Sequence, residues 1–242
     1  MKSHFRRIGI VMAMQKEAEP VIRKLKLTAL TKKNGKLPFK LFFGNLADME
    51  IYLIVNGQDA RHGIDLMGSQ PATLATHYIA EGFSPDLIIS AGTAGGLQSR
   101  GAEIGDIYLS NGPIRYHDRR YPMPDYREYG VGSYPSFDAS SLGFKLGRVS
   151  SGDSLYMSTE ESAQFEANEA DVKDMEAAAV AWVASLHEIP FMAVKTITDL
   201  IDHPVKVEEQ FVQNFEKAIG KLSDGLLELI SQRLSKGSQR LA

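Results

Sequence analysis

The sequence has 242 residues, of which 43% are hydrophobic and 24% charged, as is typical of a soluble globular protein. Its net charge of −3 argues against a nucleic-acid partner, because nucleic-acid-binding surfaces carry a basic excess. The absence of cysteine excludes disulfides, thiolate catalysis and cysteine-based metal sites.

Short apolar runs alternate along the chain with longer amphipathic stretches, which indicates strands alternating with helices. Polar residues join the second and third expected strands in the manner of a hairpin, and a polar turn is expected around 32–36. Pro71 either kinks its helix or lies in the first turn. In chain order the expected elements are strand 8–13, helix 15–27, strands 39–43 and 51–55, helix 64–81, strands 86–90, 106–110 and 147–151, helix 175–186, strand 191–197 and helix 207–234.

This order of elements predicts an α/β protein with a parallel or mixed sheet. The last helix has apolar residues three or four positions apart, which predicts one buried face. These residues are Phe211, Phe215, Ile219, Leu222, Leu226 and Ile230. We see no linker or repeat and therefore expect one domain over 1–242, with its core at about 8–232.

No apolar run approaches the roughly 20 residues of a membrane span, and 8–13 is too short for an export signal. We expect a cytoplasmic protein with no membrane partner.

The segment 115–137 is dense in tyrosine, proline and arginine and has no regular periodicity. A loop of this length usually covers a site or forms an interface, although it can also be an irregular surface excursion. Aromatic residues and arginine are typical of interfaces, so we expect this loop to contact another subunit.

A run of small residues, Ala91-Gly-Thr-Ala-Gly-Gly96, is expected to form a turn after strand 86–90. Its glycine spacing differs from the dinucleotide-binding fingerprint, which argues against an NAD-dependent enzyme. We interpret these residues as letting the backbone approach a ligand closely.

Three acidic residues are expected near the carboxyl ends of strands, where open α/β sheets bind ligands. They are Glu17, Glu176 and Asp199. Taken singly, each also fits a structural role at the start of a helix or in a turn. Together they are a candidate acid–base site.

The histidines show no i, i+4 pairing with one another, so no metal site is expected. His117-Asp118 fits hydrogen bonding within a loop better than cation binding.

Several motifs, taken in order, resemble the 5′-methylthioadenosine/S-adenosylhomocysteine nucleosidases of the nucleoside phosphorylase superfamily. The resemblance runs from about Ile8 to Phe215, and it is closer to the plant-type branch. The motifs are Met12-Ala-Met-Gln-Lys-Glu17, Ser90-Ala-Gly-Thr-Ala-Gly-Gly96, Gly105-Asp106, Tyr116-His-Asp-Arg-Arg120, Tyr129-Gly-Val-Gly132, Ser151-Gly-Asp-Ser-Leu155, Met157-Ser-Thr159, Lys173-Asp-Met-Glu176 and Thr198-Asp199.

The resemblance implies a single-domain, three-layer α/β/α fold with a central mixed, twisted sheet. It also implies hydrolysis of the N-glycosidic bond of 5′-methylthioadenosine or S-adenosylhomocysteine. The products would be adenine and a 5-thioribose, as methionine salvage requires, with no cofactor or metal. It further implies a homodimer, in which the loop around 116–124 closes the 5′ pocket of the neighbouring subunit.

The same resemblance implies roles for individual residues. Asp199 would protonate N7 of adenine, Glu17 would deprotonate the attacking water, and Glu176 would hold the ribose hydroxyls. The substrate would also be contacted by Met14, Thr93, Leu155, Tyr156 through its backbone, Met175, Lys195 and Thr198. The usual bacterial members carry arginine at the position of Lys195 and phenylalanine at that of Leu155.

The nucleophile separates the hydrolases of this superfamily from its phosphorylases. Phosphate needs arginines and a cradle of backbone amides. Here Ser90 and Ala91 precede the Gly92-Thr93 pair, and Glu17 would repel an anion. We therefore expect water as nucleophile. The alternatives are a purine nucleoside phosphorylase, an aminofutalosine-type nucleosidase and a non-catalytic nucleoside-binding protein, and the sequence leaves the preferred 5′ substituent open.

Overall fold

A computed structural model describes residues 5–31 and 35–235 of the chain. Its described strands form one sheet in the order β2-β3-β4-β1-β5-β10-β9-β7, and β11, β6 and β8 branch from β5. The strands are β1 (Arg7–Met12), β2 (Thr28–Ala29), β3 (Lys40–Leu46), β4 (Met49–Val55), β5 (Leu87–Gly96), β6 (Ile107–Ser110), β7 (Arg115–Tyr116), β8 (Lys145–Gly147), β9 (Val149–Ser151), β10 (Val172–Asp174) and β11 (Phe191–Leu200).

The sheet is mixed, as the sequence predicts. Strand β1 runs parallel to β4 and β5, and β11 also runs parallel to β5. The expected hairpin is present as the antiparallel pair β3 and β4. Because β1, β5 and β11 are parallel neighbours, their carboxyl ends meet at one edge, where the chain leaves for α1 or bends into loops.

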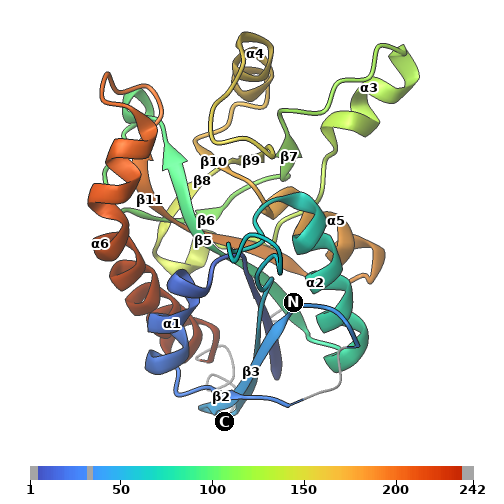
Figure 1. The fold of residues 1–242 in the computed structure, drawn as a ribbon, viewed down its shortest axis with the longest axis vertical. Coiled ribbons are helices and arrows are strands. Elements are labelled where there is room, and N and C mark those ends of the chain that lie inside the picture. Colours follow the sequence, from blue (N-terminus) through green and yellow to red (C-terminus); the bar gives the residue numbers. More distant parts are fainter. Residues whose placement is uncertain (1–4, 32–34, 236–242) are drawn as a thin grey trace.

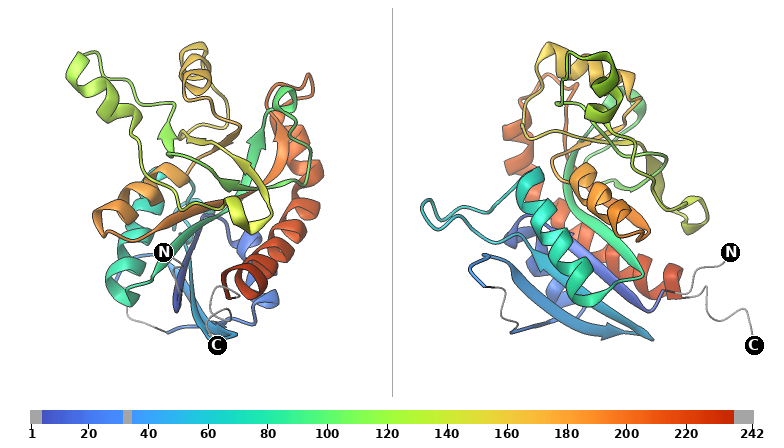
Figure 2. Two further views of the ribbon diagram at one scale, coloured as in Figure 1. Left: turned by 180° about the vertical axis from the view of Figure 1, so that it is seen from behind. Right: turned by 90° about the vertical axis from the view of Figure 1, so that its right-hand side faces the viewer.

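Helices cover both faces of the sheet, which gives the expected three layers (Figure 1). Helices α1 and α6 pack on one face and α2 and α5 on the other, each pair over its own apolar core. Helices α3 and α4 are both at the same end of the molecule, beyond these layers (Figure 2). The helices are α1 (Gln15–Lys24), α2 (Ser69–Phe83), α3 (Pro124–Val131), α4 (Thr159–Ala167), α5 (Ala177–Leu186) and α6 (Val207–Glu228), which continues as a π-helical turn over Leu229–Leu234.

Two expected element boundaries are wrong for reasons visible in the backbone. The helix expected over 64–81 begins only at Ser69, because Gly68 has a φ of +94°, which is incompatible with a helix. Pro71 consequently lies in the first turn and causes no kink. The helix expected over 15–27 ends at Lys24, and Lys26 follows with a left-handed φ of +55°.

Two strands are longer than expected. The small-residue run 91–96 is the second half of β5 and forms no turn. Strand β11 extends to Leu200, so Asp199 lies within the strand, next to a register shift between Ile197 and Asp199. The two extensions pair with each other at the centre of the sheet, and this pairing keeps small or polar residues extended.

The other differences concern the second half of the chain. The loop expected over 115–137 includes β7 and helix α3. Helix α4 was not expected, although Ser158 and Glu161 form a capping box that the sequence displays. Of the six apolar residues on the last helix, five are buried and Phe211 is half-buried. The turn expected around 32–36 lies partly outside the described residues. No described helix has the length and apolar character to cross a membrane.

Candidate active site

A cavity of about 260 Å³ opens at the edge of the sheet where β1, β5 and β11 end. Its wall combines the start of α1, the small-residue half of β5, the β10–α5 junction and the end of β11. Nine of the ten residues predicted to form the site line it: Met14, Glu17, Thr93, Leu155, Met175, Glu176, Lys195, Thr198 and Asp199. The structure therefore gathers residues that are up to 185 positions apart in the sequence.

Glu17 lies in the first turn of α1 and is only 3% exposed. One carboxylate oxygen accepts hydrogen bonds from the backbone N of Thr93 at 2.8 Å and from its Oγ1 at 2.6 Å. Burial raises the pKa of Glu17, while the Thr93 hydrogen bonds and the charge of Lys195 oppose this increase. Glu17 is thus a stronger proton acceptor than an ordinary glutamate, and the Thr93 hydrogen bonds orient its carboxylate.

Asp199 is held at the irregularity of β11 and is 4% exposed. Its Oδ1 accepts a hydrogen bond from Thr198 Oγ1 at 2.8 Å. Burial raises the pKa of Asp199, against smaller opposing effects of the Thr198 hydrogen bond and the Lys173 charge. A raised pKa favours the protonated carboxyl, which is the form that can donate a proton.

The glycines of β5 make room for these two carboxylates. A Cβ at Gly92 would lie 3.3 Å from Glu17 Oε2, and one at Gly95 would lie 2.7 Å from Asp199 Oδ2. The second distance is shorter than any ordinary carbon–oxygen contact, so a side chain at this position would displace Asp199. The small residues therefore leave space for the side chains of Glu17 and Asp199 in the cavity. This role is additional to the close approach of a ligand that the sequence suggests.

Glu176 directly precedes α5, and its Oε1 accepts a hydrogen bond from the backbone N of Gly68 at 2.8 Å. Burial, together with the nearby negative charges of Asp174 and Glu17, raises the pKa of Glu176 to about 7, and Lys195 opposes the increase. This side chain therefore changes charge near neutral pH. The left-handed Gly68 also explains why the 64–68 segment reaches the cavity as a loop.

Lys195 is paired with Asp174, a residue for which no role was predicted. Lys195 Nζ lies 2.7 Å from Asp174 Oδ2, and both side chains are at most 2% exposed. Although burial disfavours charge on both, their mutual attraction lowers the pKa of Asp174 and raises that of Lys195. Asp174 also accepts hydrogen bonds from the Ser151 hydroxyl and the Ala177 backbone N. The pair is a fixed ion pair in the wall of the cavity.

Lys173 is a second buried lysine that sequence reasoning did not assign. Its Nζ donates hydrogen bonds to the carbonyl oxygens of Ser154 at 2.6 Å and Leu155 at 3.2 Å. Burial lowers its pKa. These bonds hold Leu155 at the mouth of the cavity. Tyr156, predicted to contact the substrate through its backbone, is not among the residues that line the cavity, and its side chain is largely exposed.

Several apolar wall residues were also not predicted as site residues, and Phe211 and Met67 are the largest of them. Phe211 belongs to the apolar face of α6 that the sequence displays, and Met67 stands just before Gly68 with no sequence signal of its own.

A wider depression of about 760 Å³ lies nearby, between the first turns of α2 and the Asp118–Tyr121 segment. Asp153 joins its two sides, because it accepts from Ser69 and its backbone N donates to Asp118 at 2.7 Å.

His117 is not among the residues that line this cavity or the depression beside it. It is buried, and burial lowers its pKa to about 4, so it is neutral at physiological pH. Its Nδ1 lies 3.2 Å from Ser150 Oγ. The neighbouring Asp118 bonds a backbone amide, as expected for hydrogen bonding within a loop.

The cavity thus combines four carboxylates, one of which (Asp174) is paired with Lys195, with an apolar wall. Among the described residues that line it, the cationic side chains are Lys173 and Lys195, and both are already engaged by carbonyls or by Asp174. No arginine is among these lining residues. The site can hold an uncharged, partly apolar ligand, donate a proton from one carboxyl and accept a proton at another.

Comparisons with known proteins agree with this chemistry. The family model of the phosphorylase superfamily matches residues 7–231. A 5′-methylthioadenosine nucleosidase of Arabidopsis thaliana is 41% identical over 93% of this chain and 86% of its own length. A 5′-methylthioadenosine/S-adenosylhomocysteine nucleosidase of the same plant is 38% identical over 92% of this chain and 90% of its own. The apo structure of the Arabidopsis thaliana 5′-methylthioadenosine nucleosidase superposes with a TM-score of 0.91, at 40% identity, covering 96% of this chain and 99% of that one.

Proposed function

The chain belongs to the 5′-methylthioadenosine/S-adenosylhomocysteine nucleosidase family of the phosphorylase superfamily, and we propose that it hydrolyses 5′-methylthioadenosine to adenine and 5-methylthioribose. S-adenosylhomocysteine is the second candidate substrate, since one relative carries both names. The observation that carries the proposal is the convergence of Glu17, Glu176 and Asp199 on one cavity. Such a reaction serves methionine salvage, which we propose as the role of this protein in the cytoplasm.

In the proposed mechanism the bond between ribose C1′ and adenine N9 breaks as water attacks C1′. Asp199 transfers its proton to N7, so that adenine leaves as a neutral base. Glu17 takes a proton from the water, whose oxygen becomes the new hydroxyl at C1′. Positive charge develops on the sugar as the bond breaks, and the anionic form of Glu176 stabilises that charge while it holds the ribose hydroxyls.

Water rather than phosphate fits the groups around the nucleophile position. Glu17 is fixed there by Thr93, and an ionised carboxylate repels a phosphate dianion. The Lys195 charge that could attract phosphate is already paired with Asp174. A phosphate-binding enzyme would need free cationic donors at this position. Phosphorolysis is therefore not favoured.

We also propose that the chain acts as one domain over 1–242 and forms a homodimer through the 115–137 segment. Four of its large side chains, Tyr121, Met123, Tyr126 and Tyr129, are exposed on and around α3. Exposed aromatic and methionine side chains of this kind are typical of interfaces. The segment also walls the open depression beside the cavity, where a second subunit would cover the 5′ end of the substrate.

The proposal is tested by adenine release from 5′-methylthioadenosine by the purified protein and its variants. Asp199→Asn and Glu17→Gln should each lower kcat by about 10²–10⁴-fold, the usual contribution of a general acid or base. Glu19→Gln is the matched control, because Glu19 lies on the same helix and is exposed. Unchanged kcat in both acid variants would refute the assigned roles, and no release by the wild type would refute the activity.

A further inference from the structure

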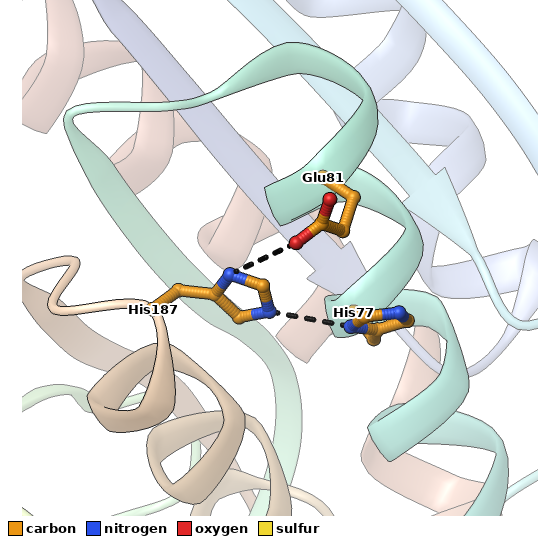
Figure 3. Close-up of side chains that lie close together, drawn as sticks. All are labelled: His77, Glu81 and His187. Atoms are coloured by element: carbon orange, nitrogen blue, oxygen red, sulfur yellow. Dashed lines mark hydrogen bonds and ion pairs between the residues drawn. The ribbon is translucent and has the colours of Figure 1, made fainter.

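Away from the cavity, three side chains on the α2–α5 face point toward one another: His77, Glu81 and His187 (Figure 3). His77 Nδ1 lies 3.2 Å from His187 Nε2, and His187 Nδ1 lies 3.5 Å from Glu81 Oε1. One potential ligand atom from each residue lies within 4.8 Å of the other two. The activity proposed above makes no use of this cluster.

The packing of two helices builds the cluster. His77 and Glu81 are four residues apart on α2, so their side chains project from the same helix face. His187 follows the last residue of α5, which packs beside α2. His187 is 110 positions from His77, so sequence spacing does not reveal the cluster as a metal site.

We propose that His77, Glu81 and His187 bind a divalent transition-metal ion of the zinc class. Imidazole nitrogens are preferred ligands of Zn²⁺, Ni²⁺ and Cu²⁺, whereas Mg²⁺ and Ca²⁺ prefer sites built from oxygens alone. Tetrahedral ligands at 2.0–2.1 Å from zinc lie about 3.3 Å apart, close to the 3.2 Å between His77 Nδ1 and His187 Nε2. The cation replaces the ring-to-ring hydrogen bond, and Glu81 contributes one negative charge.

The exposure of the cluster suits a reversible surface site. His77 and Glu81 are exposed, and the His187 side chain is 21% exposed, so an ion can enter and retain water ligands. Rotation of the exposed side chains is enough to bring three ligand atoms around one ion. No buried charge has to be created, because the ion and Glu81 stay in contact with solvent.

A bound ion would clamp α2 to α5 at a second point. The starts of these helices already meet where the backbone N of Gly68 bonds Glu176. The cluster joins their far ends, since Glu81 lies near the end of α2 and His187 lies just beyond α5. Because binding selects the folded arrangement, the ion should raise the thermal unfolding midpoint in proportion to its occupancy.

Isothermal titration of the metal-free full-length protein with ZnCl₂ tests the proposal. We expect one ion per chain, with at least tenfold weaker binding in His77→Ala and His187→Ala and weaker binding in Glu81→Gln. His62→Ala is the matched control, because His62 is exposed on a loop outside the cluster and should leave affinity unchanged. MgCl₂ should give no binding. Circular dichroism establishes that each variant is folded.

A second measurement distinguishes an ion that links α2 to α5 from adventitious zinc binding. Saturating ZnCl₂ should raise the unfolding midpoint of the wild type and of His62→Ala, and this increase should vanish in His187→Ala. Equal zinc affinity in the wild type and the two cluster histidine variants would overturn the proposal. So would the absence of one-to-one binding up to millimolar zinc. Neither result would affect adenine release, which tests the proposed activity separately.

Discussion

Lys195 Nζ and Asp174 Oδ2 lie 2.7 Å apart in an ion pair whose side chains are almost completely buried. Both residues of the pair line the cavity. The positive charge of Lys195 lowers the pKa of Glu17 and of Glu176, whereas burial raises both pKa values. Lys195, a predicted substrate contact, therefore has a dedicated acidic partner. The partner fixes where the positive charge sits relative to the two carboxylates.

Asp174→Asn should destabilise the protein strongly. Removal of one partner leaves the other charge buried and uncompensated, which typically costs 3–5 kcal/mol. Urea unfolding should report this loss. The control Glu228→Gln breaks an exposed pair with Arg233 and should cost less than about 1 kcal/mol. Similar small effects of both variants would mean that Lys195 does not depend on Asp174.

Thr93→Val should lower kcat without unfolding the protein. The change removes the 2.6 Å hydrogen bond to Glu17 and keeps the backbone donor. A hydrogen bond to a charged group contributes about 1.5–3 kcal/mol, so kcat should fall by roughly 10- to 100-fold. Thr76→Val removes a buried hydroxyl that bonds a carbonyl within α2 and is the control. A kcat for Thr93→Val equal to that of the control would show that Glu17 needs no such orientation.

The sequence predicted those features that leave a periodic or local signal. The alternation of strands and helices and the buried face of the last helix follow from apolar spacing, and the hairpin follows from the polar residues between its two strands. The site residues followed from motif resemblance, since the acids taken singly also fit ordinary helix starts. The structure adds how they are positioned: Thr93 against Glu17, and Gly95 beside Asp199.

The unpredicted features depend on contacts between distant positions. Lys173 acquires its role from carbonyls that are 18 and 19 residues away, and the metal-ligand cluster joins residues 110 positions apart. The late start of α2 depends on the left-handed conformation of Gly68, which composition does not specify. The small-residue half of β5 resembles a turn in sequence, but pairing with β11 keeps it extended.

Lys173→Met should weaken substrate binding more than it slows the chemical step. The variant loses both hydrogen bonds that hold the Ser154–Leu155 backbone at the cavity mouth. We expect KM to rise by about tenfold or more, since each lost bond to a charged donor contributes over 1 kcal/mol. Lys206→Met changes an exposed lysine just before α6 and is the control. A lower kcat with an unchanged KM would contradict this assignment.

The stability of the ligand-free protein should fall as pH rises from about 4.5 to about 7. The pKa of Glu176 is about 7 in the folded protein and about 4.5 for an ordinary glutamate, so the folded state binds more protons over this range. Glu176→Gln cannot titrate and should flatten the dependence. The measurement is the urea midpoint at several pH values, with the exposed Glu160→Gln as control. An unaltered slope in Glu176→Gln would place the pKa of Glu176 near its ordinary value.

Adenine release from 5′-methylthioadenosine, measured in phosphate-free buffer and again with added phosphate, tests the central claim most directly. Glu17 lies beside Thr93, and each cationic side chain among the described residues that line the cavity is already engaged; this predicts the full rate without phosphate and 5-methylthioribose as the sugar product. S-adenosylhomocysteine and aminofutalosine, assayed alongside, define the accepted 5′ substituent. A rate that depends strictly on phosphate, with a sugar 1-phosphate as product, would contradict hydrolysis.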